Sequence, residues 1–555
     1  MGYFASIATI GISGHYGRFD SCADLFHPFL AGVIYFDLPF SYENGQEVIT
    51  MSFAQKLFGS MRPTTRNKDH YPAYTRSAEE QYLQILLTNT MSNTFYADQN
   101  ELLNDAEQMH HEMAAANPTF MAKAIVYART AGLMRLQPLF GLAVLSAYRP
   151  DLFAEIFLRV VRIPSDLSDF LTILKGQGRG EGGRAVKRQV NRFLTGVSEY
   201  WAVKYNGRGR GYSLGDVIAT AHPKPADLKQ QALFRYLRGL EANLALLPQV
   251  EALERLKQAA GENEQIAWIE RGKLPYETVT GAIKPSKAVW EALLYQMPTF
   301  ALLRHLNTLD RAGVLDEQRH LDYVVARLTD AEALRKARIL PFRFATAFRQ
   351  IEHPELREAL RDAADLTFGN LPELGDNTAI FLDISGSMQG QYLEIGAVFA
   401  LALYKKTQGN SLFWLFNHEV HDAKPSKRDS ILGQAEHIRA SGGTDTGAPV
   451  RKLLQERKRV DQIIIITDEQ QNSGSPFYQV LAQYRAKVNP EVKAFIVDIA
   501  PYRHAMVPQT DRNTFYIYGW SDTVLSYIAQ SVQGYASMTE QVATLDLDAL
   551  SKHNK

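Results

Sequence analysis

Cysteine is almost absent from the chain: Cys22 is the single one among 555 residues. A disulfide within the chain needs two thiols and a cysteine-rich zinc site needs several, so both are excluded. Such low cysteine content is typical of proteins that stay in a reducing compartment. We therefore expect a cytoplasmic protein.

Long apolar runs and an excess of one charge are also missing. No stretch of about 18 apolar residues occurs, so the sequence predicts no membrane span and no membrane partner. Lys and Arg total 60, as do Asp and Glu, so the formal net charge is zero. A neutral chain exerts no global field on a polyanion, and any nucleic-acid site must be a local basic patch. The length calls for more than one hydrophobic core.

The first fifty residues lack the features of a signal peptide. They are rich in glycine and aromatic residues, without a basic start followed by a continuous apolar core. A second plausible start follows at Met51. We expect residues 1–50 to be a dispensable N-terminal extension, and a native peptide from within it would refute a start at Met51.

Oxygen-bearing side chains follow strand-like segments in the last third of the chain. An apolar run ends in Asp383, a Gly-rich loop spans 441–447, and a run of isoleucines ends in Asp468. A small divalent cation takes about six hard oxygens, from a few carboxylates, hydroxyls and water. The pattern predicts a site for Mg²⁺ with one position left for an outside ligand. Its ligands would be Asp383, Ser385, Ser387, Thr444 and Asp468.

Short β-rich runs alternate with helical patterns, such as 393–406, around these residues. The alternation predicts a parallel, doubly wound α/β sheet, in which ligands bind beyond the carboxyl ends of the strands. The runs occupy 378–384, 411–416, 462–467, 493–498 and 514–518.

Catalytic alternatives fit these residues less well. A phosphatase with an Asp nucleophile would need a second acid where Ser385 stands, and no nucleophile elbow is present there. A two-metal nuclease clusters several carboxylates, whereas hydroxyls dominate here. We therefore expect metal-mediated binding and no enzyme activity. The motif resembles the metal-ion-dependent adhesion site (MIDAS) of von Willebrand factor A (vWA) domains, in which the five matching residues bind magnesium directly or through water.

Helical periodicity extends from about residue 77 to 350. Ser77 followed by Glu79 and Glu80 is typical of a capped helix start. Later breaks fall at Pro118, Pro150, Pro164 and Pro298. Successive short helices predict a stacked α-solenoid, and an irregular helical domain remains the alternative.

Basic residues are concentrated in one part of this helical region. Positions 184, 187, 188 and 192 share one helical face by their spacing. Such a stripe can contact phosphates, and the aromatic residues at 200–212 could stack on bases. A solvated helix face is the simpler alternative. The candidate RNA-binding residues are Lys175, Arg179, Arg184, Lys187, Arg188, Lys204, Arg208, His222 and Lys224.

Several segments resemble the TROVE module of Ro autoantigen proteins. They are Trp-Ala-Val-Lys-Tyr-Asn-Gly-Arg at 201–208, Ser-Leu-Gly-Asp-Val-Ile at 213–218, Ala-His-Pro-Lys-Pro at 221–225, Val-Trp-Glu-Ala-Leu-Leu at 289–294, and Ala-Arg-Ile-Leu-Pro-Phe at 337–342. Glycines at 206–211 and Leu214 depart from the family pattern. A vWA-like domain follows, as in Ro proteins, so we expect a bacterial member of that family.

The resemblance implies a mainly helical fold. A HEAT-like repeat ring (51–370) would be closed by a doubly wound vWA domain (371–555), as a monomer. In the family, the outer basic surface binds small noncoding Y RNAs, and the central hole takes single-stranded ends of misfolded RNAs. Lys204, Arg208 and His222 match positions implicated in Y RNA binding, and the helix from Arg184 matches a basic helix of that face.

The implied function is noncoding-RNA quality control and stress survival without catalysis. A bacterial member would have an exoribonuclease partner, polynucleotide phosphorylase, tethered through RNA. A second hypothesis remains open: a metal-dependent protein-binding adaptor in which RNA binding is incidental.

Overall fold

The computed structural model describes residues 62–206, 211–337, 339, 342–368, 373–508, 511, 513–519 and 537–547, with backbone alone for 41–43, 46–48 and 342. The chain divides into two units, Met1–Ser60 and Met61–Lys555. In the first, strands β1 (Ser41–Glu43) and β2 (Gln46–Val48) pair antiparallel. The rest of the predicted extension 1–50 lies outside the described residues, so its dispensability stays a prediction.

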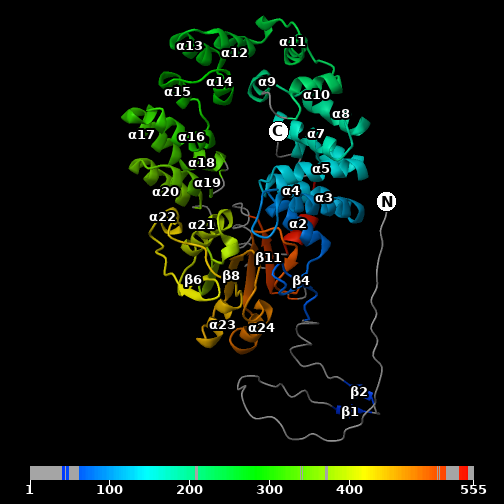
Figure 1. The fold of residues 1–555 in the computed structure, drawn as a ribbon, viewed down its shortest axis with the longest axis vertical. Coiled ribbons are helices and arrows are strands. Elements are labelled where there is room, and N and C mark those ends of the chain that lie inside the picture. The colour runs from blue at the N-terminus through cyan, green and yellow to red at the C-terminus, as the bar shows by residue number, and fades with distance from the viewer. Residues whose placement is uncertain are drawn as a thin grey trace, which may run out of the picture. The chain divides into compact units, whose positions relative to one another are not determined.

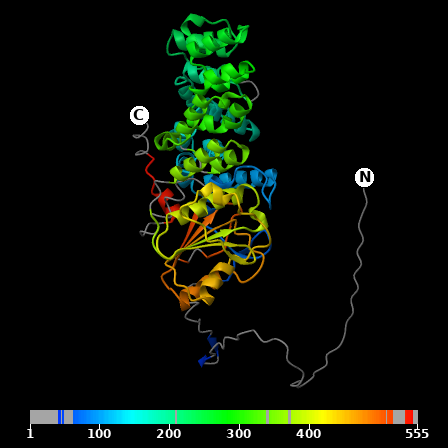
Figure 2. The same cartoon turned by 90° about the vertical axis from the view of Figure 1, so that its left-hand side faces the viewer.

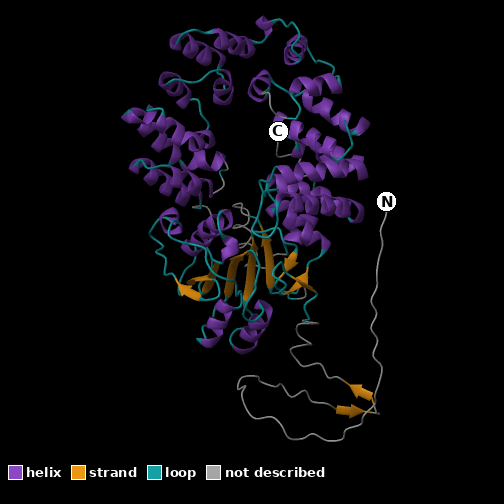
Figure 3. Ribbon diagram, in the orientation of Figure 1, coloured by secondary structure: helices purple, strands orange, loops and turns teal. Residues whose placement is uncertain are grey.

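The predicted helical region is a succession of short helices (Figure 3). Ser77 caps the first one, because its hydroxyl accepts from the amide of Glu80 at 3.2 Å. Pro118, Pro150 and Pro164 each stand in the first turn of a helix, where a missing amide costs nothing. The helices are α2 (Ala78–Thr88), α3 (Gln99–Ala116), α4 (Pro118–Thr130), α5 (Leu136–Tyr148), α6 (Pro150–Val160), α7 (Pro164–Gly176), α8 (Gly183–Leu194), α9 (Glu199–Tyr205), α10 (Leu214–Ala221), α11 (Leu228–Leu237), α12 (Pro248–Gln258), α13 (Glu262–Gly272), α14 (Tyr276–Ala282), α15 (Lys287–Leu294), α16 (Thr299–Arg311), α17 (Gln318–Leu328), α18 (Ala331–Ala337), α19 (Phe342–Gln350) and α20 (Pro354–Thr367).

Each helix packs mainly on helices near to it in sequence, as expected of a solenoid. Helix α5 contacts α3, α4, α6 and α7, whereas α12 contacts α9, α13 and α14. Such stacking buries one continuous apolar core along the array. The solenoid prediction is confirmed for the described helices.

The C-terminal part contains a six-stranded sheet in the order β11-β9-β8-β5-β6-β7. All neighbouring strands are parallel except the edge pair β6 and β7. The five predicted runs are all strands, so the doubly wound sheet is confirmed. The strands are β5 (Thr378–Asp383), β6 (Leu412–Phe416), β7 (Val420–Asp422), β8 (Gln462–Thr467), β9 (Lys493–Asp498) and β11 (Thr514–Tyr518).

The two faces of this sheet belong to different cores. Alternate side chains of a strand point to opposite faces, so Ile464 and Ile466 join the core that continues into the helical array. Ile463 and Ile465 pack instead with α23 (Ala448–Gln455) and α24 (Phe477–Lys487). The sheet therefore shares its core with the helices on one face.

Both ends of the helical array contact the sheet domain, so the second unit is a closed ring (Figure 1), which Figure 2 shows from its side. At one end, β4 (Pro72–Thr75) pairs with β3 (Thr65–Arg66) and with β10 (His504–Ala505), and α4 contacts α26 (Met538–Ala543). At the other, α19 contacts α21 (Gln391–Lys405) and α20 contacts α22 (Ile431–Ala435). The predicted fold class, a HEAT-like helical ring with a doubly wound α/β domain, is confirmed.

The predicted domain boundary near residue 370 stays a prediction, and the hairpin β3–β4, far before it, pairs with the sheet domain. None of the helices described in the structure combines the length and apolar character needed to cross a bilayer.

Candidate functional site

Three loops meet at the carboxyl ends of β5 and β8, which are adjacent and parallel. The amide of Gly386 donates to the carbonyl of Gly442 at 2.9 Å, which joins the loop after β5 to the Gly-rich loop. The amide of Asn472 donates to the carbonyl of Thr444 at 3.0 Å, which adds the loop after β8. The fold thus brings together the three segments that carry the five predicted metal ligands.

The side chains of these five residues are almost completely buried. The hydroxyls of Ser385 and Ser387 lie 3.2 Å apart. One carboxylate oxygen of Asp383 accepts from the amide of Ser385 at 2.8 Å, and the other accepts from the Thr467 hydroxyl at 2.6 Å. Asp468 Oδ1 accepts from the Gln470 amide at 3.2 Å, whereas its Oδ2 has no hydrogen-bond partner among the described residues.

The two acids of this cluster are both buried, which opposes their ionisation. Burial, together with the negative charge of Asp383, raises the pKa of Asp468 to about 8. Burial also raises the pKa of Asp383. Two buried carboxylates beside three hydroxyls form a hard-oxygen donor set, and a divalent cation there would stabilise both ionised acids. The residues present therefore fit a metal of the Mg²⁺ type.

A loop from the helical array lies beside the predicted metal ligand Ser387. Residues 90 and 92–95, between α2 and α3, line a pocket of about 250 Å³ together with Ser387, Gln389 and Tyr392. Next to it, the hydroxyl of Tyr96 donates to Asp69 Oδ2 at 2.7 Å. Sequence patterns did not indicate Asp69 or Tyr96, because neither belongs to a motif. Both come near the predicted metal ligands only because this end of the helical array contacts the sheet domain.

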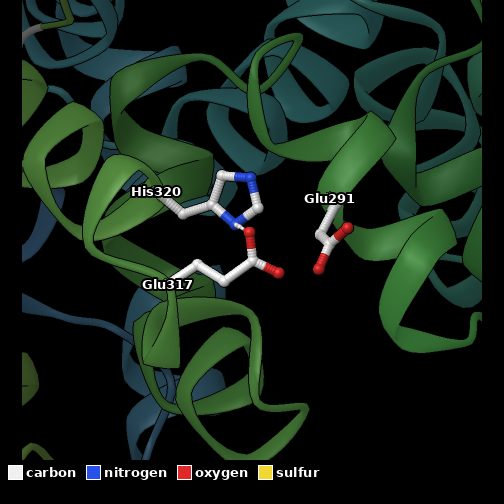
Figure 4. Close-up of side chains that lie close together, drawn as sticks. All are labelled: Glu291, Glu317 and His320. Atoms are coloured by element: carbon white, nitrogen blue, oxygen red, sulfur yellow. Dashed lines mark ion pairs between the residues drawn. The ribbon is translucent and has the colours of Figure 1, made fainter.

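A second acidic group lies on the other arm of the ring. Glu291, Glu317 and His320 have ligand atoms within 4.8 Å of one another (Figure 4). The ammonium of Lys287 lies 3.8 Å from Glu291 and 3.4 Å from Glu317, and Arg319 Nη2 lies 2.8 Å from Glu317, so two basic side chains already balance the two carboxylates. His320 Nδ1 lies 3.0 Å from the carbonyl of Val314. This group is explained by its internal ion pairs.

Helix α8 has the two faces that its spacing predicts. Val186, Val190 and Phe193 are buried against the array. The opposite face is exposed and carries four basic side chains, and the first turn contains no acidic residue. The exposed side chains are Arg184, Lys187, Arg188 and Arg192. Binding of RNA by this face stays a prediction.

The neighbouring candidate RNA-binding residues differ in whether their side chains are hydrogen-bonded within the protein. Lys175 is exposed and lies 6.0 Å from the ring of Tyr212. Arg179 is instead tied to α5, because its Nη1 donates to the Ala143 carbonyl at 2.7 Å and to the Ser146 hydroxyl at 2.6 Å. Burial lowers the pKa of Arg179 without bringing it near neutrality.

Lys204 is also engaged within the protein. Its ammonium lies 3.2 Å from Glu277 and within 6 Å of the rings of Tyr200 and Tyr205. With Lys273 and Tyr276 it lines a pocket of about 470 Å³. Sequence patterns did not indicate Lys273 or Tyr276, since no local pattern connects them to Lys204.

The remaining candidates lie around α10. His222 follows that helix as its C-cap, in the left-handed conformation with φ 52°, and is exposed. Lys224, two residues on, is exposed as well. Arg208 lies outside the described residues. RNA contacts by these three stay predictions.

Comparisons with known proteins agree with this architecture. The TROVE domain family model matches residues 271–391, and the Ro60 vWA domain model matches 378–532. The RNA-binding protein RO60 of Deinococcus radiodurans is 25% identical over 487 residues, which are 80% of this chain and 91% of that protein. The RNA-binding protein RO60 of Caenorhabditis elegans is 28% identical over 314 residues, 51% of this chain and 48% of that protein.

A solved structure shows the same fold. The crystal structure of the Deinococcus radiodurans RO (RSR) protein matches with a TM-score of 0.62 at 23% identity. The match covers 82% of this chain and 100% of the other. With a match to the TROVE domain model followed by a match to the Ro60 vWA domain model, the chain is similar to Ro proteins over most of its length.

Proposed function

We propose that the protein is a noncatalytic RNA-binding ring. The observation that carries the proposal is the exposed basic face of α8, which presents Arg184, Lys187, Arg188 and Arg192 to solvent. The two RO60 relatives are named as RNA-binding proteins, which supports the same ligand class. Because the net charge of the chain is zero, this local patch is the feature that would attract a polyanion.

The shape of the patch favours a structured RNA of the Y type. Arg184 and Lys187 lie in the first two turns of α8, whose partial positive charge adds to theirs. The helix N-cap, Gly182, has no side chain that competes for the free amides. Lys175, His222 and Lys224 extend the patch along α7 and beyond α10. Phosphate contacts of this kind position a folded RNA without reading its sequence.

Single-stranded ends of misfolded RNA would bind at a different surface. The pocket beside Lys204 combines Lys204 and Lys273 with the rings of Tyr200 and Tyr276. Glu270 and Glu277 line the pocket too and offset the two lysines, so its aromatic faces, on which bases can stack, are the feature that suits single-stranded RNA. We assign this pocket, and the ring that contains it, to such ends.

The vWA domain would bind Mg²⁺ through Asp383, Ser385, Ser387, Thr444 and Asp468. The cation would serve binding and architecture, because hydroxyls outnumber carboxylates around it. We place the protein in the cytoplasm as a monomeric ring, acting in RNA quality control and stress survival with an exoribonuclease such as polynucleotide phosphorylase. These assignments are inferred from the family resemblance.

A titration of labelled RNA tests the proposal. The triple variant Arg184→Gln, Lys187→Gln, Arg188→Gln should bind a Y-like RNA about tenfold or more weakly at physiological salt. The matched control, Arg311→Gln, Arg335→Gln, Lys336→Gln, removes three exposed charges from another part of the ring and should keep the affinity. Equal affinities of the two triple variants would reject this surface.

The adaptor hypothesis is the second candidate, and the pocket above the metal site favours it. A partner protein could place an acidic side chain there, with RNA incidental. Purification from cells distinguishes the two: the RNA-binding ring retains a discrete small RNA, whereas the adaptor retains protein alone.

A further inference from the structure

The carboxylate of Asp69 is hydrogen-bonded to two residues, Tyr96 and Asn472, that lie next to predicted metal ligands. It belongs to the turn between β3 and β4, in the hairpin that leads into the helical array. Its Oδ2 accepts from the Tyr96 hydroxyl at 2.7 Å and from Asn472 Nδ2 at 3.3 Å. Within the described ranges no lysine or arginine forms an ion pair with it, since the adjacent Lys68 pairs with Glu101 at 2.6 Å.

Both donors to Asp69 also contact predicted metal ligands. Burial is the main cause that raises the pKa of Tyr96, and the negative charge of Asp468 raises it further. The Tyr96 hydroxyl also interacts with the side chain of Ser387. Asn472 Oδ1 accepts from the amide of Thr444 at 2.9 Å. Asp69 is thus connected to the predicted ligand set by two routes, each through a single intervening residue.

The ligand set itself lacks a partner on this side. Asp468 is 1% exposed, and its Oδ2 has no hydrogen-bond partner among the described residues. Three hydroxyls and two carboxylates supply five oxygens, whereas Mg²⁺ takes six in octahedral array. One position is then left for a further oxygen, and Asp69 is a carboxylate that hydrogen bonds to Tyr96 and Asn472 place one residue away from the set.

We propose that Asp69 supplies the acidic oxygen at the open position of the divalent-cation site, directly or through one water. The inference rests on the proposed Mg²⁺ site and names its outer ligand. The bound cation would then clamp the β3–β4 hairpin, and with it the first helices of the array, onto the sheet domain. Binding of the cation would thus be coupled to closure of the ring.

Calorimetric titration of the full chain with Mg²⁺ tests the proposal. In Asp69→Asn the side-chain oxygen still accepts from Tyr96 but the charge is lost, so affinity should fall about 10- to 100-fold. Glu112→Gln removes one exposed negative charge from α3 and is the control, with affinity equal to wild type. Thermal unfolding in chelator should be equal for all three proteins, which shows that each is folded.

Added acetate provides a second readout. It should strengthen Mg²⁺ binding to Asp69→Asn, because a free carboxylate can enter the emptied position, and leave wild type unchanged. The inference would be overturned if Asp69→Asn bound Mg²⁺ as tightly as wild type does, or if acetate strengthened Mg²⁺ binding equally in both proteins. Either outcome would leave the metal site itself intact. A different result, no Mg²⁺ binding to wild type, would reject the metal site and the inference together.

Discussion

Arg76 and Asp498 form an ion pair of 2.8 Å although 422 positions separate them in the chain. Their side chains are 0% and 1% exposed. The same guanidinium also pairs with Glu469 and donates from Nε to the carbonyl of His504 at 2.7 Å. Arg76 stands directly before α2, so one side chain ties the start of the helical array to three parts of the sheet domain.

Loss of Arg76 should strongly destabilise the protein. Arg76→Met would leave buried carboxylates without a positive partner, which costs about 3–5 kcal/mol. The control, Lys257→Met, breaks a largely exposed pair with Glu254 and should cost less than about 1 kcal/mol. The free energy of unfolding in urea measures both, and equal values for the two variants would contradict a closing role for Arg76.

Acid should weaken the fold through His110. This side chain is completely buried, with Nδ1 3.0 Å from the Tyr82 hydroxyl and Nε2 3.0 Å from Gln137 Oε1. Burial lowers the pKa of His110 to about 3, with a smaller contribution from His111 and an opposing one from Gln137. The folded protein therefore keeps this ring neutral.

The sign of the pH effect follows from the unfolded state. The unfolded ring has a pKa near about 6.5, so the unfolded chain binds more protons below that value. Stability should fall from pH 6.5 toward pH 3, by about 2 kcal/mol at pH 5 from this group. In His110→Gln the pH slope should be smaller, and in the control His437→Gln, which changes an exposed histidine of the sheet domain, it should be unchanged. Parallel curves for wild type and His110→Gln would refute this assignment.

Mg²⁺ should raise the melting temperature through the hydroxyl ligands. A cation at about 100 times its dissociation constant stabilises the folded state by about 2.7 kcal/mol. Ser385→Ala with Ser387→Ala should abolish the Mg²⁺-dependent shift in thermal denaturation. Ser411→Ala, at the opposite end of the sheet, should retain it. An unchanged shift in the double variant would place any bound Mg²⁺ elsewhere.

Arg179 and Lys175 should differ in their effects, although both are basic and close in sequence. Arg179→Gln removes two hydrogen bonds to the end of α5 and should cost about 1–3 kcal/mol of stability. Lys175→Gln should leave stability unchanged and reduce the slope of log affinity for RNA against log salt by about 0.7 to 0.9. A smaller salt slope in Arg179→Gln than in Lys175→Gln would contradict this division.

Sequence patterns predicted most of the secondary structure, and they picked out five side chains that the fold brings together, whose binding of a metal stays a prediction. Apolar periodicity sufficed for the helices and strands because each depends on its own buried face. Asp383 and Asp468 could be recognised because both follow strands that end at the same edge of the sheet. Asp69 could not, since its place above them depends on the pairing of β4 with β10.

For the basic residues too, sequence patterns predicted local structure but not contacts with distant parts of the chain. The spacing of Arg184, Lys187 and Arg188 was enough to predict an exposed face, because the apolar positions between them fix the orientation of α8. Spacing could not predict that Arg179 donates to α5 or that Glu277 lies beside Lys204. Those partners come from other helices, and only the packed array brings them near.

The pairing of Arg76 with the region of His504 also sets an order of events during synthesis. These residues are 428 positions apart, so the first helices leave the ribosome well before their closing partner exists. At about 5–20 residues per second this interval is about 20 to 90 seconds. Until then β4 is paired with β3 alone, so one of its edges is open, and so is one end of the nascent array. Any RNA that the growing chain meets in this interval could enter from the side, without threading an end.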